Sequence, residues 1–439
     1  MKKGGKNEIK RKNNNLKENG ITLIALIVTI VILLILAGVT LNAVFSDNGI
    51  IKMARDAQTK TDQGVQKDLE PMGELEDLIN KNAGENKGEE AVKISTMVGK
   101  GAVTKNTKAV DAYGNKITIP KGFKVLPHNP TSSTGAVTYT YNEDNTPAVQ
   151  DGIVIEDTQT GTAGNQFVWV PVGTINNKAG DSRGTTSTIT LGRYSDFTMT
   201  NGAVASGQPA QVASVENCTQ EVTINTYYKE LSTSREGNSA EDSTAENATA
   251  RDLKTFIETS LANGGYYIAR FEASKNKTTN KIESQYSKTV LTAITQPNAA
   301  TLAREMYGEV KENNELVYAS DLVNSYAWDT AIIFIQTYST GEDASNYASK
   351  NKSTSLTYTG TNDDKYCNVW DMSGNYREWT TEYSSYSKSN ILYPCSNRGG
   401  YCELGEIGAR NYTSYREYQQ TKNGNWLQRH SIRSILYVK

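Results

Sequence analysis

The segment NVWDMSGNYREWT, from Asn368 to Thr380, has tryptophans on both sides of a Ser-Gly-Asn turn. Gly and Asn tolerate positive φ, so the turn can be tight, and each tryptophan can bury a large area beside it. In the later segment NRGGYC, from Asn397 to Cys402, two glycines let the backbone pass closely beneath a packed element. We expect the neighbouring Arg398 to be paired internally, and Arg433 likewise. These features predict a packed core around the two segments.

Regular elements are predicted on the N-terminal side of these segments. Short β-branched and aromatic runs at Ile117–Pro120, Phe167–Pro171 and Tyr266–Glu272 predict strands separated by Gly, Asn and Thr turns. Helical spacing of apolar residues predicts helices from Asp252 to Leu261 and from Leu322 to Thr337. The pattern predicts a mixed domain of helices and strands.

In the first helix, Leu253, Phe256, Ile257 and Leu261 fall on one face, and the Gly264-Gly265 pair ends the helix. We therefore expect this face to pack on the core.

One long apolar segment precedes the domain: ITLIALIVTIVILLILAGVTL, from Ile21 to Leu41, contains no charged residue. At about 1.5 Å per residue, a helix of this length spans a hydrocarbon core of about 30 Å. The basic leader, residues 1–20, keeps the N-terminus cytoplasmic by the positive-inside rule. We expect a transmembrane anchor over residues 21–45 and an extracytoplasmic remainder at the cell surface. A buried core helix is the alternative.

Four further regions follow from composition. Residues 46–83 keep helical spacing and predict a stalk, and residues 84–93 are charged and Gly-containing, which is typical of a solvated linker. Residues 94–439 form the predicted domain. Within it, residues 174–250 are rich in Thr, Ser, Asn and Gly and predict a long surface insertion.

Charge and metal-ligand residues exclude some functions. The net charge is −2, so no basic surface for nucleic acid is expected. The four cysteines form no CxxC pair, and the chain has only two histidines, His128 and His430, which argues against a zinc cluster.

The junction between leader and anchor, Lys17 to Ile24 (KENGITLI), resembles the prepilin peptidase site of type IV pilins and pseudopilins. This resemblance implies cleavage between Gly20 and Ile21, with prepilin peptidase as a partner. The family usually has Glu at the fifth mature position, where this chain has Ala25. We therefore expect an anchor, and a minor pilin subunit is the structural alternative.

The domain resembles formylglycine-generating-enzyme-like (sulfatase-modifying factor) domains, which have a C-type-lectin-like fold. The resemblance covers roughly Lys116 to Lys439 and implies the fold class α+β. It is carried by these blocks in order: FVWVP from Phe167, GGYYIARFEAS from Gly264, AWDTAIIFI from Ala327, the Asn368 and Asn397 segments, and SIRSILYVK from Ser431.

The resemblance implies one metal site and one activity. Asn375 and Glu378 match positions that ligate structural calcium in the family; the alternative is an ordinary turn with a surface glutamate. No other cofactor is expected. Catalytic members bind copper through two nearby cysteines downstream of the Arg-Gly-Gly block, but here Cys395 precedes Arg398 and only Cys402 follows it. A non-haem iron site would need more histidines. We therefore expect no enzyme, with a metal-dependent oxidase as the alternative.

The region from Glu382 to Leu427 is dense in Tyr, Ser, Asn and Arg, a composition typical of recognition loops. It predicts binding of an extracellular protein or glycan, and aromatic packing is the alternative. The layout also resembles the variable proteins of diversity-generating retroelements, with a varied stretch from Tyr401 to His430. The predicted ligand-binding residues are Tyr401, Tyr412, Tyr415, Arg416, Tyr418 and Trp426.

Overall fold

The computed structural model describes residues 91–127, 147–200, 203–204, 211–218, 222–224, 227–230, 252–340, 344–350, 356–389, 391–400, 412–419 and 427–439. They belong to one compact unit, Ala91–Lys439. The predicted leader, anchor and stalk, with Gly20 and Ile21, lie outside the described residues. Within the described ranges, no helix is both long enough and apolar enough to cross a membrane.

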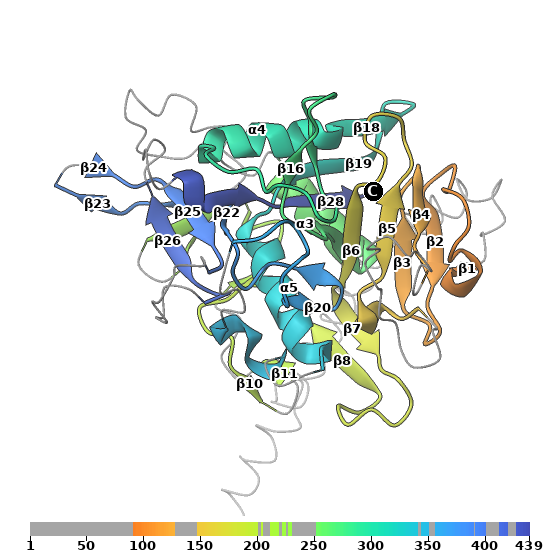
Figure 1. Cartoon of the computed structure of the whole chain (residues 1–439). Helices are drawn as coiled ribbons and strands as arrows, with labels where there is room; N and C mark the ends of the chain where they lie inside the picture. The colour runs from red at the N-terminus through yellow and green to blue at the C-terminus, as the bar shows by residue number, and fades with distance from the viewer. Residues whose placement is uncertain are drawn as a thin grey trace, which may run out of the picture. The chain divides into compact units, whose positions relative to one another are not determined.

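The larger sheet has seven strands, and every neighbouring pair in it is antiparallel (Figure 1). Two of its central strands, β6 and β15, are the aromatic and β-branched runs that the sequence predicts as strands. In spatial order the strands are β18 (Glu309–Glu312), β19 (Glu315–Leu322), β28 (Ser434–Val438), β15 (Gly265–Ala269), β6 (Gln166–Pro171), β5 (Val154–Asp157) and β4 (Phe123–Val125).

The second sheet has six strands and contains part of each segment that begins the sequence argument, Arg377–Thr380 in β22 and Asn397–Arg398 in β25. Its main path is antiparallel, and β27 pairs in parallel with β22. In order the strands are β13 (Val222–Ile224), β14 (Tyr228–Glu230), β22 (Arg377–Ser384), β25 (Cys395–Arg398) and β26 (Arg416–Gln419), with β27 (His430–Ile432) beside β22. Only Arg433 separates β27 from β28, so the chain passes from one sheet to the other at this residue.

Smaller strand pairs surround the two sheets. A three-stranded sheet joins β1 (Val92–Lys93), β2 (Thr107–Val110) and β3 (Lys116–Ile119). Two-stranded pairs are β7 (Gly173–Asn176) with β8 (Thr186–Ile189), β9 (Gly192–Arg193) with β12 (Gln211–Val212), β10 (Met199–Thr200) with β11 (Ala203–Val204), β16 (Ser274–Lys275) with β17 (Ile282–Glu283), β20 (Lys365–Tyr366) with β21 (Val369–Trp370), and β23 (Ser387–Lys388) with β24 (Ile391–Leu392).

The described part of the chain contains three α-helices: α3 (Leu253–Asn263), α4 (Gln296–Tyr307) and α5 (Ser325–Tyr338). Their N-cap residues are Asp252, Thr295 and Asn324, respectively. The side chain of each N-cap residue accepts a hydrogen bond from a backbone N–H in the first turn of its helix. The predicted helices at α3 and α5 are confirmed, and α4 was not predicted. The expected apolar face of α3 is wrong at Leu261, whose side chain is 49% exposed.

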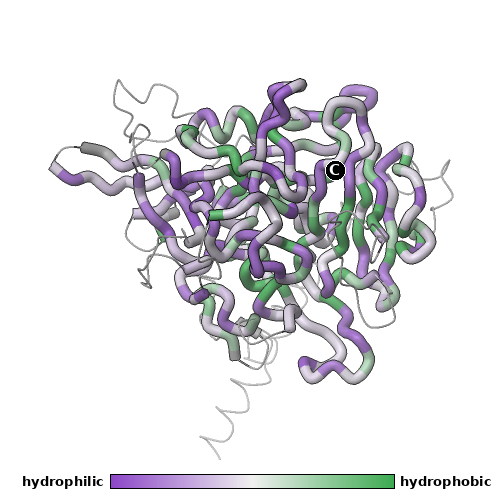
Figure 2. The backbone as a smooth tube through the Cα atoms, in the orientation of Figure 1, coloured by the Kyte–Doolittle hydropathy of each residue, from purple (hydrophilic) through white to green (hydrophobic). Residues whose placement is uncertain are grey.

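The core lies between the sheets and around α5, every residue of which is buried. Figure 2 shows hydrophobic residues along the central strands and hydrophilic residues in the outlying loops. Trp169, Trp328 and Trp379 are among the largest fully buried side chains. A Cβ at Gly399 would lie 3.1 Å from the Met372 carbonyl oxygen and 3.3 Å from the Trp328 ring, which confirms the predicted close approach of the Arg-Gly-Gly backbone.

The predicted surface insertion is wrong in part, because some of its described residues are buried, whereas others, such as Val212 and Val215, are exposed. Tyr194, Arg193 and Glu230 are fully buried, and β14 from this region is a strand of the second sheet. The polar composition does not predict this burial, because the burial of Arg193 and Glu230 depends on partners far away in the sequence.

Candidate recognition surface

Four partly exposed tyrosines meet at one end of the second sheet, on the side where Figure 1 shows β23, β24 and β26. Tyr386 and Tyr418 are stacked with 3.8 Å between ring centroids. Tyr227 stands edge-on to both, at 5.0 and 6.1 Å. Tyr393 lies 5.6 Å from Tyr386 and 5.8 Å from Tyr418. We call these four residues the tyrosine cluster.

Strand pairing explains why these tyrosines meet. The β22–β25 connection begins at Ser385, and the N–H of Tyr393 donates to the carbonyl of Tyr386 across its base at 3.0 Å. The Ser385 N–H donates to the Tyr227 carbonyl at 3.1 Å, which places the start of β14 beside this connection. Tyr418 lies on β26, the neighbour of β25. Four separate positions in the chain thus form one aromatic surface.

The sequence argument identified only Tyr418 of this cluster. Tyr386 and Tyr393 lie inside the Tyr-rich region, but their contact depends on the hairpin-like return of the chain. Tyr227 lies in the predicted insertion and gave no sequence signal. Of the other predicted ligand-binding residues, Tyr412 and Tyr415 are partly exposed beside β26, whereas Tyr401 and Trp426 lie outside the described residues.

Arg416 is a correction to the predicted binding residues. Its side chain is 5% exposed; its guanidinium pairs with Asp329 and, at 3.1 Å, with Glu382. Arg398 lies 2.5 Å from Asp329, and Arg193 lies 2.6 Å from Glu382. A buried group needs such partners because desolvation is costly, so this guanidinium faces inward. We call these five residues the Arg416 cluster; its pairs confirm the internal pairing predicted for Arg398.

Charges in the Arg416 cluster are nearly balanced. Burial alone would raise the pKa of Glu382, but Arg416 and Arg193 outweigh it and lower this pKa to about 2. Glu230 lies beside the cluster, where burial raises its pKa to about 7 against the opposing effect of Arg193. The Ser325 N–H donates to Glu230 at 2.7 Å, so this carboxyl also has a protein partner. These ion pairs lie near the end of β22, which Tyr386 follows in the chain.

A second buried cluster surrounds Arg433 and includes both predicted calcium ligands. Glu378 is fully buried and accepts from the Arg433 guanidinium at 2.6–3.0 Å, so it is not a surface glutamate. Asn375 donates to Glu272 at 2.5 Å and accepts the Thr357 N–H at 2.9 Å. Both predicted calcium ligands are thus bonded to protein groups, and a calcium ion at Glu378 would compete with Arg433. Within the described ranges, no group of three or more His, Cys, Asp or Glu is arranged to hold a metal.

Four carboxyl groups, those of Glu272, Asp364, Asp371 and Glu378, surround the Arg433 guanidinium. We call these five residues the Arg433 cluster. Burial raises the pKa of Asp364 to about 7 and that of Asp371 to about 6. Burial also raises the pKa of Glu272 and of Glu378, and Arg433 opposes the shift in all four. The pairing of Glu378 with Arg433 confirms the internal partner predicted for this arginine.

Two of the residues considered for oxidation chemistry, Cys395 and His430, lie in the interior. Cys395 is fully buried in β25, and Cys402 lies outside the described residues. His430 is 1% exposed and stacks on Trp379 with 4.1 Å between ring centroids. Burial raises the pKa of the Cys367 thiol to about 12, which disfavours its reactive thiolate.

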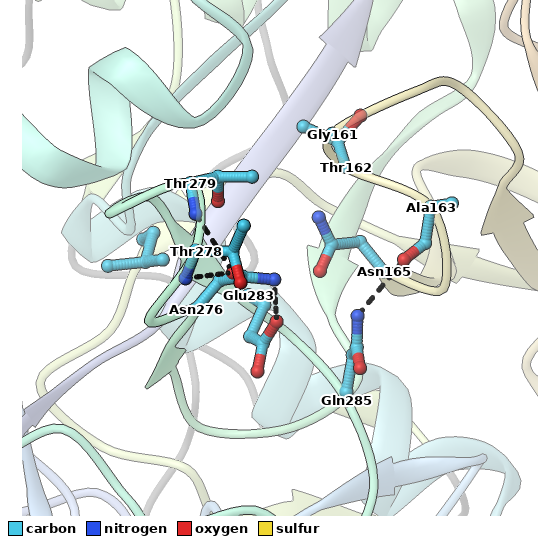
Figure 3. Close-up of a pocket in the computed structure, with 10 residues that line it drawn as sticks. Gly161, Thr162, Ala163, Asn165, Asn276, Thr278, Thr279, Glu283 and Gln285 are labelled. Carbon is cyan, nitrogen blue, oxygen red and sulfur yellow. Dashed lines mark hydrogen bonds between the residues drawn. The ribbon is translucent and has the colours of Figure 1, made fainter.

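A polar hollow of about 260 Å³ lies elsewhere, between the Gly161–Asn165 loop and the β16–β17 pair (Figure 3). Its side chains mostly bind one another: Asn276 donates to Glu283 at 3.0 Å, and Gln285 donates to the Ala163 carbonyl at 3.1 Å. Without an aromatic face or a reactive group in its lining, it is a weaker candidate than the tyrosine cluster.

One family model, described as a sulfatase-modifying factor enzyme 1-like domain, matches residues 154–434. No curated protein and no solved structure matches the chain. The matched range contains the tyrosine cluster and both buried charge clusters.

Proposed function

The chain belongs to the sulfatase-modifying factor enzyme 1-like family, and from that premise we propose that it uses this domain to recognise an extracellular protein or glycan. The observation that carries the proposal is the tyrosine cluster, an aromatic surface supported by a rigid ion-paired interior. Tyrosine supplies wide amphipathic contact area with few rotatable bonds, so binding orders little side-chain freedom. The neighbouring Tyr412 and Tyr415 extend this surface in the proposal.

The apolar sequence from Ile21 to Leu41 supports a proposal for the location of this domain. We propose that it anchors the chain in a membrane and that the domain is displayed at the cell surface. Processing between Gly20 and Ile21 is part of the same proposal. Epitope labelling of intact and permeabilised cells tests it, and an epitope detected only after permeabilisation would contradict surface display.

Binding is best tested with paired tyrosine substitutions. Tyr227→Ala with Tyr418→Ala removes two rings from the cluster, and Tyr358→Ala is the control because Tyr358 is 58% exposed and lies outside it. On glycan arrays and a panel of folded proteins, we expect the double variant to bind at least tenfold more weakly than the wild type, a loss of about 1.4 kcal/mol or more. Equal binding by the wild type and the double variant would reject this surface.

A second candidate function is metal-dependent oxidation, which membership of a family with enzymatic members favours. It predicts copper-dependent oxygen consumption by the purified chain that Cys402→Ser abolishes. The burial of Cys395 argues against a two-cysteine copper site formed with Cys402 in this conformation. Copper-dependent turnover by the wild type, together with no binding on the glycan arrays or to the protein panel, would favour oxidation over recognition.

Two further alternatives have direct tests. A minor pilin would place the domain on filaments, which immunogold labelling would show. A diversified protein would have, downstream in the DNA, a near-copy of the coding sequence for the Tyr401–His430 stretch, differing at adenines and lying beside a reverse transcriptase.

A further inference from the structure

The stacked pair inside the tyrosine cluster has a geometry that suits covalent chemistry. The rings of Tyr386 and Tyr418 lie 3.8 Å apart between centroids, with an angle of 26° between their planes. This distance is close to van der Waals contact between carbon atoms, so ring carbons of the two phenols lie within contact of one another. The hydrogen-bond interaction with Tyr386 is the largest cause that raises the pKa of Tyr418 to about 12.

We propose that Tyr386 and Tyr418 are a modification site at which a peroxide-fed one-electron oxidant forms an intramolecular dityrosine cross-link. This inference does not depend on whether the tyrosine cluster binds a ligand. It needs only two adjacent phenols that an oxidant can reach, and both side chains are partly exposed.

The reaction balances with hydrogen peroxide as the terminal oxidant. Each phenol loses one electron and one proton from its hydroxyl group and becomes a phenoxyl radical. The radicals join through one ortho carbon each, and the ring hydrogens at these carbons shift to the oxygens, which restores both phenols. The two electrons and two protons removed reduce one hydrogen peroxide molecule to two water molecules.

The other pairs in the cluster fit this coupling less well. Tyr227 stands at 76° to Tyr386 and at 78° to Tyr418, so it forms T-shaped rather than stacked contacts with both rings. Tyr393 stands at 58° and 77° to the same rings, with centroids at least 5.6 Å away. Only the Tyr386–Tyr418 pair combines near-parallel planes with contact distance.

The cross-link would join two parts of the sheet that no covalent bond now ties directly. Tyr386 lies in the connection that carries β23 and β24, and Tyr418 lies on β26 beyond β25. Joining them restricts the unfolded chain, as a disulfide does, so the oxidised domain should resist unfolding better than the untreated one. Such a cross-link would suit a domain that is displayed in an oxidising extracellular environment.

The purified full chain is treated with hydrogen peroxide and a haem peroxidase and then digested with trypsin. Cleavage after Lys and Arg places Tyr386 in residues 378–388 and Tyr418 in residues 417–422, whereas Tyr393 falls in residues 389–398. We expect a joined 378–388/417–422 peptide, two hydrogen atoms lighter than the sum of its parts, from protein that remains monomeric in a denaturing gel. Fragmentation distinguishes Tyr386 from the buried Tyr383 in the same peptide.

Matched phenylalanine variants keep every ring and remove one hydroxyl. Tyr386→Phe and Tyr418→Phe should each abolish the joined peptide, whereas Tyr393→Phe should keep it at the wild-type yield. Free tyrosine in a parallel sample verifies that the oxidant is active. The proposal is overturned by an uncross-linked wild-type chain under that active oxidant, by a joined peptide that persists in Tyr386→Phe, or by cross-links that form only between chains.

Discussion

Strand β22 contributes one glutamate to each buried charge cluster, and the clusters differ in balance. In the Arg416 cluster, three arginines face Asp329 and Glu382. In the Arg433 cluster, one guanidinium faces four carboxyl groups. The pKa of Glu382 is lowered to about 2, whereas that of Asp364 is raised to about 7.

The difference shows that burial alone does not decide the ionisation of a carboxyl group. Both carboxyl groups are fully buried, and burial is the largest influence on the pKa of each. The number of nearby guanidinium groups determines the net direction of the shift. The Arg416 cluster should therefore be stable as an ionised network, and the Arg433 cluster should hold protons near neutral pH.

The largest expected effect comes from Arg433→Met. This substitution removes the cation that opposes the raised pKa of all four carboxyl groups, so we expect the free energy of unfolding to fall by about 3–5 kcal/mol in urea denaturation. The control is Lys254→Met, whose pair with Glu258 is exposed on α3 and should contribute about 0–1 kcal/mol. A loss no larger than that of the control would remove the basis of the comparison.

A smaller loss is expected from Arg416→Met. Asp329 keeps its contact with Arg398, and Glu382 keeps its contact with Arg193, so neither carboxylate is left alone. We expect the free energy of unfolding to fall by about 1–3 kcal/mol in the same assay. If Arg416→Met cost more than Arg433→Met, the balanced cluster would be the more fragile one.

The third prediction concerns the pH dependence of the Arg433 cluster. Asp364 has a pKa of about 7 in the folded protein, against an ordinary value of 3.8, so the folded state binds its proton more tightly than the unfolded state. Its contribution to stability is full below pH 4 and is lost as the pH rises through about 7, at up to about 1.4 kcal/mol per pH unit. Asp364→Asn should flatten the decline of the melting temperature between pH 4 and 7. An unchanged slope would contradict the raised pKa.

The fourth effect is a pH dependence that is confined to acid pH and has the opposite sign. The pKa of Glu382 is about 2 in the folded protein, below its ordinary value of 4.5, so its stabilisation is full above pH 4.5 and is lost as the pH falls through 2. Glu382→Gln should lower stability at pH 7 and flatten only the acid limb of the stability curve. A change confined to the range between pH 5 and 7 would instead point to Glu230, whose pKa is about 7.

Local sequence patterns predicted the elements well where one face had a clear period. The helices α3 and α5 and the strands β3, β6 and β15 were predicted from apolar spacing and turn residues. Helix α4 was missed because its polar residues and Pro297 weaken that pattern, although Pro at the start of a helix is favourable. The site was predicted only in part, since Tyr418 was identified but Tyr227, Tyr386 and Tyr393 were not.

The sequence by itself determined the mixed helix and strand composition, the packing of Gly399 beneath its neighbours and the internal pairing of Arg398 and Arg433. These follow from residue chemistry that local context fixes: glycine fits where a side chain does not, and a buried guanidinium needs a carboxylate. Only the tertiary structure decided that Arg416 faces inward, that Glu378 binds Arg433, and that four tyrosines from distant positions share one surface. Burial and charge balance depend on partners brought together by the sheet, and spacing along one chain does not encode which partners meet.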